Sequence, residues 1–242
     1  RLRDVVGDAS FVGGTDMYFC NLNRTRPIVE AMDGVYWSMN PQVHAFDDRS
    51  LMETCAPQAD TVRTARSFAG DLPLVVSAVT LLPRWNPYLV GPAREPGPGE
   101  LPPEVDPRQL SQLAAAWTLG SIKYLAEAGA ASVTYYETAG WRGVIERESG
   151  SPEPELFPSA PGQPFPVFHV FAELAALRPA EVITCDSSDP LSAVGLALSD
   201  GHGTRVLMAN MTAERQTVEI AGVARLELEP YAVETSSMLA GG

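Results

Sequence analysis

Four short apolar runs of the chain each end next to side chains that could do chemistry. The runs span residues 10–14, 34–38, 72–79 and 131–137. At or just after their ends lie Asp16, Asn21, Asn23 and Arg24, then Asn40, His44, Asp47 and Asp48, then Arg84, Trp85 and Asn86, and finally Glu137, Trp141 and Arg142. Carboxylates and histidine carry protons, amides and guanidinium groups bind hydroxyls, and indole rings pack on the C–H faces of sugars. The set therefore indicates a carbohydrate site.

Glu137 is the most specific of these candidates. In an extended strand Val133, Tyr135 and Glu137 share one side, and the carboxylate is reached just where the strand ends. We therefore predict that Glu137 is unpaired, faces a pocket at the strand ends and acts as a base or nucleophile. The alternative is a structural ion pair between Glu137 and Arg142 or another arginine.

A second proton carrier is expected at His44, oriented by Asp47 or Asp48. The alternative is a loop histidine that holds its own backbone. Asp16 could serve simply as the cap of the helix that follows it.

Substrate binding is predicted at five further residues. Arg84 or Arg142 would stabilise an oxyanion, and Trp85 or Trp141 would be a platform for a sugar ring. The predicted substrate-binding residues are Asn40, Arg84, Trp85, Trp141 and Arg142. The aromatic residues Trp37, Trp117, Tyr135 and Tyr136 are assigned to packing.

The spacing of residues matches neither a metal site nor the site of a serine hydrolase. His44, Asp47, Asp48 and Glu137 match no recognised ligand motif, and the three cysteines are widely separated. The chain has no G-x-S-x-G segment, the turn typical of Ser-His-Asp hydrolases. No metal and no cofactor is therefore expected.

The apolar runs alternate with amphipathic segments, a pattern typical of parallel β/α units. Four units are half of the eight that close a barrel, so residues 1–178 are predicted to be the C-terminal half of a (β/α)8 barrel. A flavodoxin-like open sheet is disfavoured because the chain lacks a G-x-G-x-x-G turn. A half barrel leaves two unpaired edges, so we expect the N-terminal half of the same barrel as a partner, with a homodimer as the alternative. The start at Arg1 instead of Met fits a chain that has lost upstream sequence.

After residue 178 the period changes to closely spaced strands. Runs at 191–198, 204–210, 216–220 and 225–229 are predicted as strands, with a hairpin turn at Asp200-Gly-His-Gly. Residues 179–242 are therefore expected to form a small antiparallel, β-sandwich-like domain.

Composition narrows the class of protein. The formal net charge of the 242 residues is -13, which would repel a phosphate backbone, so a nucleic acid partner is not expected. No apolar run approaches the length of a membrane span, and no secretion signal opens the chain, so a cytoplasmic protein without membrane contact is expected.

Three segments, GGTDMYFCNLNR at 13–24, NPQVHAFDD at 40–48 and TYYETAGWRG at 134–143, together resemble the D-apionate lactonase family. The resemblance runs from about residue 10 to the C-terminus, and RVLMANMT at 205–212 is similar to the β domain that follows such barrels. This family in turn resembles the retaining (β/α)8 glycoside hydrolases. The resemblance implies a sugar-lactone or glycoside hydrolase whose first four barrel strands lie outside this chain. In the retaining glycosidases the nucleophile sits on the seventh strand and the acid/base ends the fourth, whereas Glu137 by our count ends the eighth.

The sequence thus predicts a hydrolase of carbohydrate metabolism that acts on a small sugar lactone. Glu137 is its expected base or nucleophile, and His44 with Asp47 its second proton carrier. The alternatives are a retaining TIM-barrel glycoside hydrolase and a non-catalytic carbohydrate-binding or structural piece. Activity is expected only when the chain is joined to the N-terminal half of the barrel.

Overall fold

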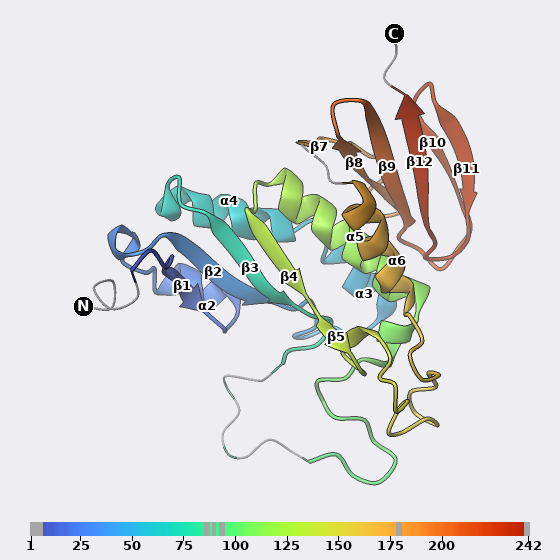
Figure 1. Cartoon of the computed structure of the whole chain (residues 1–242), viewed down its shortest axis with the longest axis horizontal. Coiled ribbons are helices and arrows are strands. Elements are labelled where there is room, and N and C mark those ends of the chain that lie inside the picture. Colours follow the sequence, from blue (N-terminus) through green and yellow to red (C-terminus); the bar gives the residue numbers. More distant parts are fainter. Residues whose placement is uncertain (1–6, 85–87, 89–90, 92–94, 178–180, 240–242) are drawn as a thin grey trace.

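The computed structural model describes residues 7–84, 88, 91, 95–177 and 181–239. Figure 1 shows a helix-covered sheet that carries the first half of the chain and a β layer formed by the last quarter, with helix α5 between them. Within the described residues no helix is both long and apolar enough to cross a membrane.

The first sheet is parallel, as the sequence predicts. Its strands lie in the order of the chain, β1-β2-β3-β4. They are β1 (Val12–Thr15), β2 (Gly34–Met39), β3 (Leu74–Val79) and β4 (Ser132–Tyr135). Between them run the helices α2 (Phe19–Arg24), α3 (Asp48–Glu53), α4 (Gln58–Ala69) and α5 (Gln112–Glu127), with the 3₁₀ turns η1 (Val29–Ala31) and η2 (Pro107–Leu110). The predicted alternation of strand and helix is confirmed.

The two faces of this sheet differ in polarity. One face packs under the helices, where Val35, Trp37 and Val76 are fully buried. The opposite face carries Tyr36, Ser38 and Ser77, which remain half-buried, and Thr134, which is exposed. Side chains alternate along a strand, so strands that direct their apolar side chains toward the helices place the intervening polar side chains on the opposite face.

The predicted strand over 131–137 is interrupted. Val133 and Tyr135 pack against the helical core, and the Tyr135 hydroxyl lies 2.7 Å from Ser121 Oγ of α5. Tyr136 then takes a φ of 53°, in the left-handed region, so the strand ends there. Glu137 belongs to a new short strand, β5 (Glu137–Ala139), paired with β6 (Gly143–Ile145). The expectation that one strand places Glu137 on a common side with Val133 and Tyr135 is therefore wrong.

Helix α5 lies at the centre of the molecule. It is preceded by η2, where the Asp106 carboxylate accepts a hydrogen bond from the backbone N–H of Arg108. The sequence predicts one apolar face for this helix, but the structure buries residues on every side, including Thr118 and Ser121. The reason is that α5 contacts α4 and α6 (Pro166–Leu177) and also the strands of the second sheet.

The last quarter of the chain is antiparallel β structure. A four-stranded sheet has the order β12-β9-β8-β7, and β10 and β11 form a separate hairpin. The strands are β7 (Glu181–Ile183), β8 (Ala193–Ser199), β9 (Gly203–Asn210), β10 (Gln216–Ile220), β11 (Ala224–Leu228) and β12 (Val233–Leu239). The four predicted strands are present, whereas β7 and β12 were not anticipated.

Two polar side chains set turns in this β layer. Asp200 Oδ1 accepts hydrogen bonds from the backbone N–H groups of His202 and Gly203, at 2.8 and 3.0 Å, which forms the predicted hairpin turn. The buried Asn210 donates from Nδ2 to the carbonyl oxygens of Glu214 and Glu229, at 2.7 and 2.9 Å. Asn210 thereby ties the end of β9 to the β10–β11 hairpin.

Candidate active site

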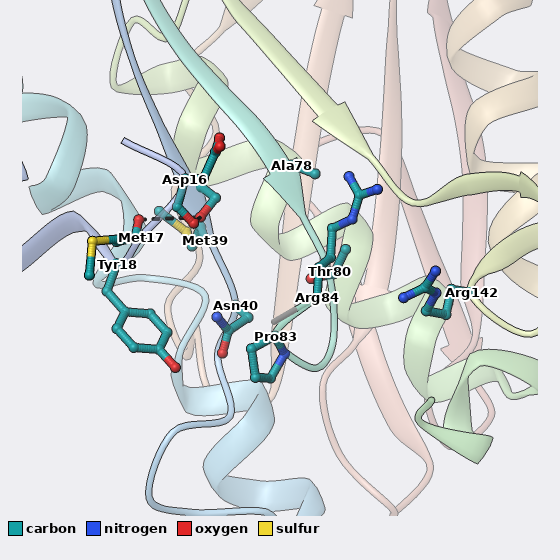
Figure 2. Close-up of a pocket in the computed structure, with 11 residues that line it drawn as sticks. Asp16, Met17, Tyr18, Met39, Asn40, Ala78, Thr80, Pro83, Arg84 and Arg142 are labelled. Atoms are coloured by element: carbon teal, nitrogen blue, oxygen red, sulfur yellow. Dashed lines mark hydrogen bonds between the residues drawn. The ribbon is translucent and has the colours of Figure 1, made fainter. Parts of the chain in front are cut away.

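A pocket of about 470 Å³ opens at the carboxyl ends of the strands of the parallel sheet. It is lined by Asp16, Met17, Tyr18, Ser38, Met39, Asn40, Ala78, Thr80, Pro83, Arg84 and Arg142. Figure 2 shows Asp16, Met17 and Tyr18 on one side of it and Arg84 and Arg142 on the other. Carboxyl ends of parallel strands are where α/β barrels carry their active sites. Three of the five predicted substrate-binding residues, Asn40, Arg84 and Arg142, lie here.

Asp16 is the one carboxylate among the described residues that line this pocket. Its Oδ1 atom accepts a hydrogen bond of 3.1 Å from the Tyr36 hydroxyl, and its backbone carbonyl accepts one of 2.6 Å from Ser38 Oγ. The capping role considered for Asp16 is not what is found, because Tyr18 occupies the N-cap position of α2 and makes no side-chain cap. Desolvation raises the pKa of Tyr36, and its hydrogen bond to Asp16 raises it further.

Gly14 lets Tyr36 reach Asp16. Gly14 and Tyr36 are partners in the pairing of β1 with β2. A Cβ atom on Gly14 would lie only 1.7 Å from the Tyr36 carbonyl oxygen. The strands can therefore approach this closely only with glycine at this position.

Asn40 contributes an unpaired acceptor to the pocket wall. Its Oδ1 atom is buried and has no hydrogen-bond partner within the described part of the chain. A buried polar atom without a partner costs about 1 to 3 kcal/mol, and a rotation of the Asn40 side chain would let a hydroxyl group bound in the pocket relieve this penalty. Asn40 is therefore suited to bind a polyhydroxylated molecule.

Glu137 pairs with Arg142 and does not itself line this pocket. Its Oε1 is 2.6 Å from Arg142 Nη2, and both side chains are about one-third exposed, at 34% and 31%. The short turn between β5 and β6 brings the two residues together, since the Glu137 N–H donates to the Arg142 carbonyl at 2.9 Å. The expectation that Glu137 is unpaired and faces the pocket is wrong, and the ion-pair alternative holds.

His44 and Asp47 also lie outside the pocket lining. His44 is exposed, and Asp47 is the N-cap of α3, where its carboxylate accepts from the Ser50 backbone N–H at 2.9 Å. That hydrogen bond lowers the pKa of Asp47. The structure thus does not bring Glu137, His44 and Asp47 to one cleft.

Of the two tryptophans predicted as sugar platforms, the structure describes Trp141, whereas Trp85 lies outside the described residues. Trp141 packs beside Phe157, with ring centroids 6.3 Å apart, and its Nε1 donates to Ser151 Oγ at 3.0 Å. Trp141 is not part of the pocket lining, whereas Trp37 and Trp117 are fully buried as expected.

A polar network beneath the pocket holds the loop after β2. The buried Gln42 donates from Nε2 to the Leu81 carbonyl and to Asp106 Oδ2, at 2.8 and 2.7 Å. Arg108 bonds to both oxygens of Asp106, to Gln42 Oε1 and to Asp48, the last at 2.8 Å. This network joins the segments that carry Asn40 and Arg84.

The network also sets the charge of Asp106. Burial would raise the pKa of Asp106, but hydrogen bonds from Arg108 and Gln42 outweigh it and lower the pKa. The Asp106 hydrogen bond in turn raises the pKa of Arg108. Among the described residues no group of three or more His, Cys, Asp or Glu side chains is placed to hold a metal ion.

Solved structures place this fold in the class of TIM barrels with an attached β domain. A GH30 endoxylanase from Clostridium papyrosolvens aligns with a TM-score of 0.57 at 7% identity, covering 98% of this chain and 57% of the other. A family 51 α-L-arabinofuranosidase from Bifidobacterium longum aligns with a TM-score of 0.52 at 12% identity, covering 99% and 58%. At these identities the likeness defines the fold alone.

The family follows from the sequence comparisons. Residues 1–179 match the TIM barrel domain of D-apionate lactonase, and residues 190–236 match its C-terminal immunoglobulin-like domain. The D-apionate lactonase of Brucella anthropi is 31% identical over 233 residues, which are 96% of this chain and 36% of that protein. The chain belongs to the D-apionate lactonase family and spans about a third of the length of this relative.

Proposed function

We propose that this chain is part of an enzyme that hydrolyses a small sugar lactone. The observation that supports this most directly is a polar pocket at the carboxyl ends of the strands in a member of the D-apionate lactonase family. The volume of about 470 Å³ suits a single small sugar ring. Its lining offers hydroxyl, amide, carboxylate and guanidinium groups, which are the partners that a hydroxylated lactone needs.

We assign the pocket residues separate roles in lactone hydrolysis. Opening a lactone requires an activated water at the acyl carbon and stabilisation of the oxyanion that forms. Arg84 or Arg142 would stabilise the oxyanion, and Asn40 would accept a hydrogen bond from a substrate hydroxyl. We assign Glu137 to holding the Arg142 guanidinium in position, since it pairs with Arg142 and does not line the pocket itself.

A retaining glycoside hydrolase is the second candidate, supported by the fold of its structural neighbours. That chemistry needs two carboxyl groups about 5 Å apart. The strand that we count as seventh, β3, ends at Val79. The segment that follows it, Thr80-Leu-Leu-Pro-Arg84, contains no carboxylate. Asp16 is the single carboxylate on the described pocket lining. This chain therefore supports lactone hydrolysis better than glycoside cleavage.

We further propose that residues 1–178 are the second half of an eight-stranded barrel, followed by the β domain from residue 179. The support is an ordered row of four parallel strands in which β1 and β4 are the edges. The face that would line the barrel interior carries polar side chains such as Tyr36 and Ser77. The N-terminal half of the same barrel would cover both edges, and a homodimer is the alternative.

The test is an activity screen of the full-length protein against sugar lactones and aryl glycosides. We expect hydrolysis of a small sugar lactone, followed by titration of the acid released, and no turnover of aryl glycosides. Turnover of aryl glycosides with no lactone hydrolysis would reverse the assignment in favour of the glycosidase.

A further inference from the structure

The lactone hydrolysis proposed above leaves open which side chain activates the water. We propose that Asp16, held by the Tyr36 hydroxyl, is the general base of this reaction. The inference rests on the proposed function and gives one step of it to Asp16, which the sequence pattern places at a strand end without a catalytic role.

The position of Asp16 supports this role. Asp16 follows β1 directly, so its side chain is placed by the strand and by the hydrogen bond from Ser38 Oγ to its backbone carbonyl. The Thr15 hydroxyl accepts from the Met17 N–H at 3.0 Å and fixes the same turn. The carboxylate therefore rests on a rigid strand end, which is what precise proton transfer needs.

The pairing of the Asp16 carboxylate also supports this role. Its Oδ1 accepts from Tyr36, while within the described ranges it makes no ion pair and its other oxygen has no protein donor. Glu137 and Asp106 are instead paired with arginines, and Asp47 caps a helix. Of these carboxylates, Asp16 alone combines a place on the pocket wall with an oxygen able to accept a proton from water.

Charge of opposite sign lies on the two sides of the pocket. Arg84 and Arg142 lie on the side opposite Asp16 (Figure 2). A lactone between them would have its carbonyl oxygen toward a guanidinium group and its acyl carbon open to a water on the Asp16 side. That arrangement separates the base from the group that stabilises the oxyanion.

A water O–H bond breaks and its proton moves to Asp16, while the water oxygen bonds to the acyl carbon and the carbonyl π pair moves onto the carbonyl oxygen. When this pair re-forms the carbonyl, the ring C–O bond breaks and Asp16 returns the proton to the leaving ring oxygen. The product is the open-chain hydroxy acid, and Asp16 is again ionised.

The decisive experiment measures Asp16→Asn in the full-length protein. We expect kcat to fall about 10²- to 10⁴-fold with KM nearly unchanged, because the amide cannot take a proton. Asp60→Asn, an exposed aspartate on α4 paired with Arg63, is the matched control and should keep full activity. Tyr36→Phe should give an intermediate loss, since it removes the orienting hydrogen bond and leaves the carboxylate.

A second variant separates chemistry from structure. In Asp16→Ala, added formate should restore at least tenfold of the lost turnover, because it supplies a carboxylate in the space that the substitution opens. Wild-type activity in Asp16→Asn, or a loss confined to KM that formate does not relieve, would overturn the assignment of Asp16 while lactone hydrolysis by the wild type stands. If the wild type hydrolyses no lactone, the proposed function fails, and this inference fails with it.

Discussion

At the scale of single residues, a position just after a strand identifies part of the pocket lining, whereas Asn21, Asn23 and His44 meet the same condition and do not line it. Asn40, Arg84 and Arg142 reach it as predicted, and Asp16 reaches it from the same rule applied to β1. Glu137 stood out because strand alternation seemed to aim it inward. The left-handed φ of Tyr136 breaks that alternation, and no residue pattern around Tyr136 signals it.

Glu137→Gln tests whether this residue positions Arg142 or moves a proton itself. Because glutamine keeps the shape but loses the charge that holds the guanidinium, we expect about a tenfold loss of kcat/KM, matching the energy of one charge-assisted hydrogen bond. Arg142→Ala should cost at least as much, and the double variant should be no worse than Arg142→Ala alone. A loss of several orders of magnitude in kcat alone would make Glu137 a proton carrier.

Arg108→Gln tests the network under the pocket. We expect a loss of about 3 kcal/mol in the free energy of unfolding near neutral pH, because Asp106 would remain buried without its cation. Arg63→Gln is the matched control on an exposed pair and should change the stability little. Chemical denaturation of the three proteins measures the difference.

The same network predicts an acid dependence of stability. The pKa of Asp106 in the folded chain lies below its ordinary value of 3.8, so its contribution is present above that value and is lost as the pH falls through the folded pKa. Wild-type stability should therefore fall on acidification from about pH 5 toward pH 3, and Arg108→Gln should show a shallower fall over this window. Equal slopes for the two proteins would mean that Asp106 is not the group responsible.

At the scale of elements, Gly14 decides how closely β1 and β2 approach. Gly14→Ala should destabilise the chain by about 2 kcal/mol or more, because its Cβ would meet a backbone oxygen that cannot move aside. Gly97→Ala is the control, since only the flexible Glu100 side chain lies near its added methyl group. Thermal unfolding measures both, and equal melting temperatures would contradict the strand geometry described here.

The sequence predicted those elements whose signals are local. Apolar runs marked β1 to β4, and Asp200-Gly-His-Gly marked a hairpin. It did not predict features that depend on distant contacts. An amphipathic pattern was expected for helix α5 because the β layer, its second packing partner, lies far away in the sequence. Asp16 was considered as a helix cap because its hydrogen-bond partner Tyr36 lies on the neighbouring strand, twenty residues away in the sequence.

At the scale of the whole molecule, the open edges of the parallel sheet lead to a prediction about association. A sheet with free edges at β1 and β4 and a polar inner face should pair with further strands. We expect this 242-residue chain to dimerise when purified alone and to lose the dimer when the upstream half is supplied in the same polypeptide. Light scattering on both forms measures this, and a stable, fully active monomer of this chain alone would contradict the half-barrel proposal.

The burial of α5 on every side has a consequence for how the two domains unfold on heating. The helix packs on α4 and α6 and also on β8 and β9, and its Glu127 carboxylate accepts a hydrogen bond from the Cys185 backbone N–H at 3.1 Å. Separating the β layer from the helix would expose an apolar helix flank to water, so neither part is a detachable module. The barrel segment and the immunoglobulin-like domain should therefore melt in a single calorimetric transition, and a protease cut between them should leave the two fragments bound to each other.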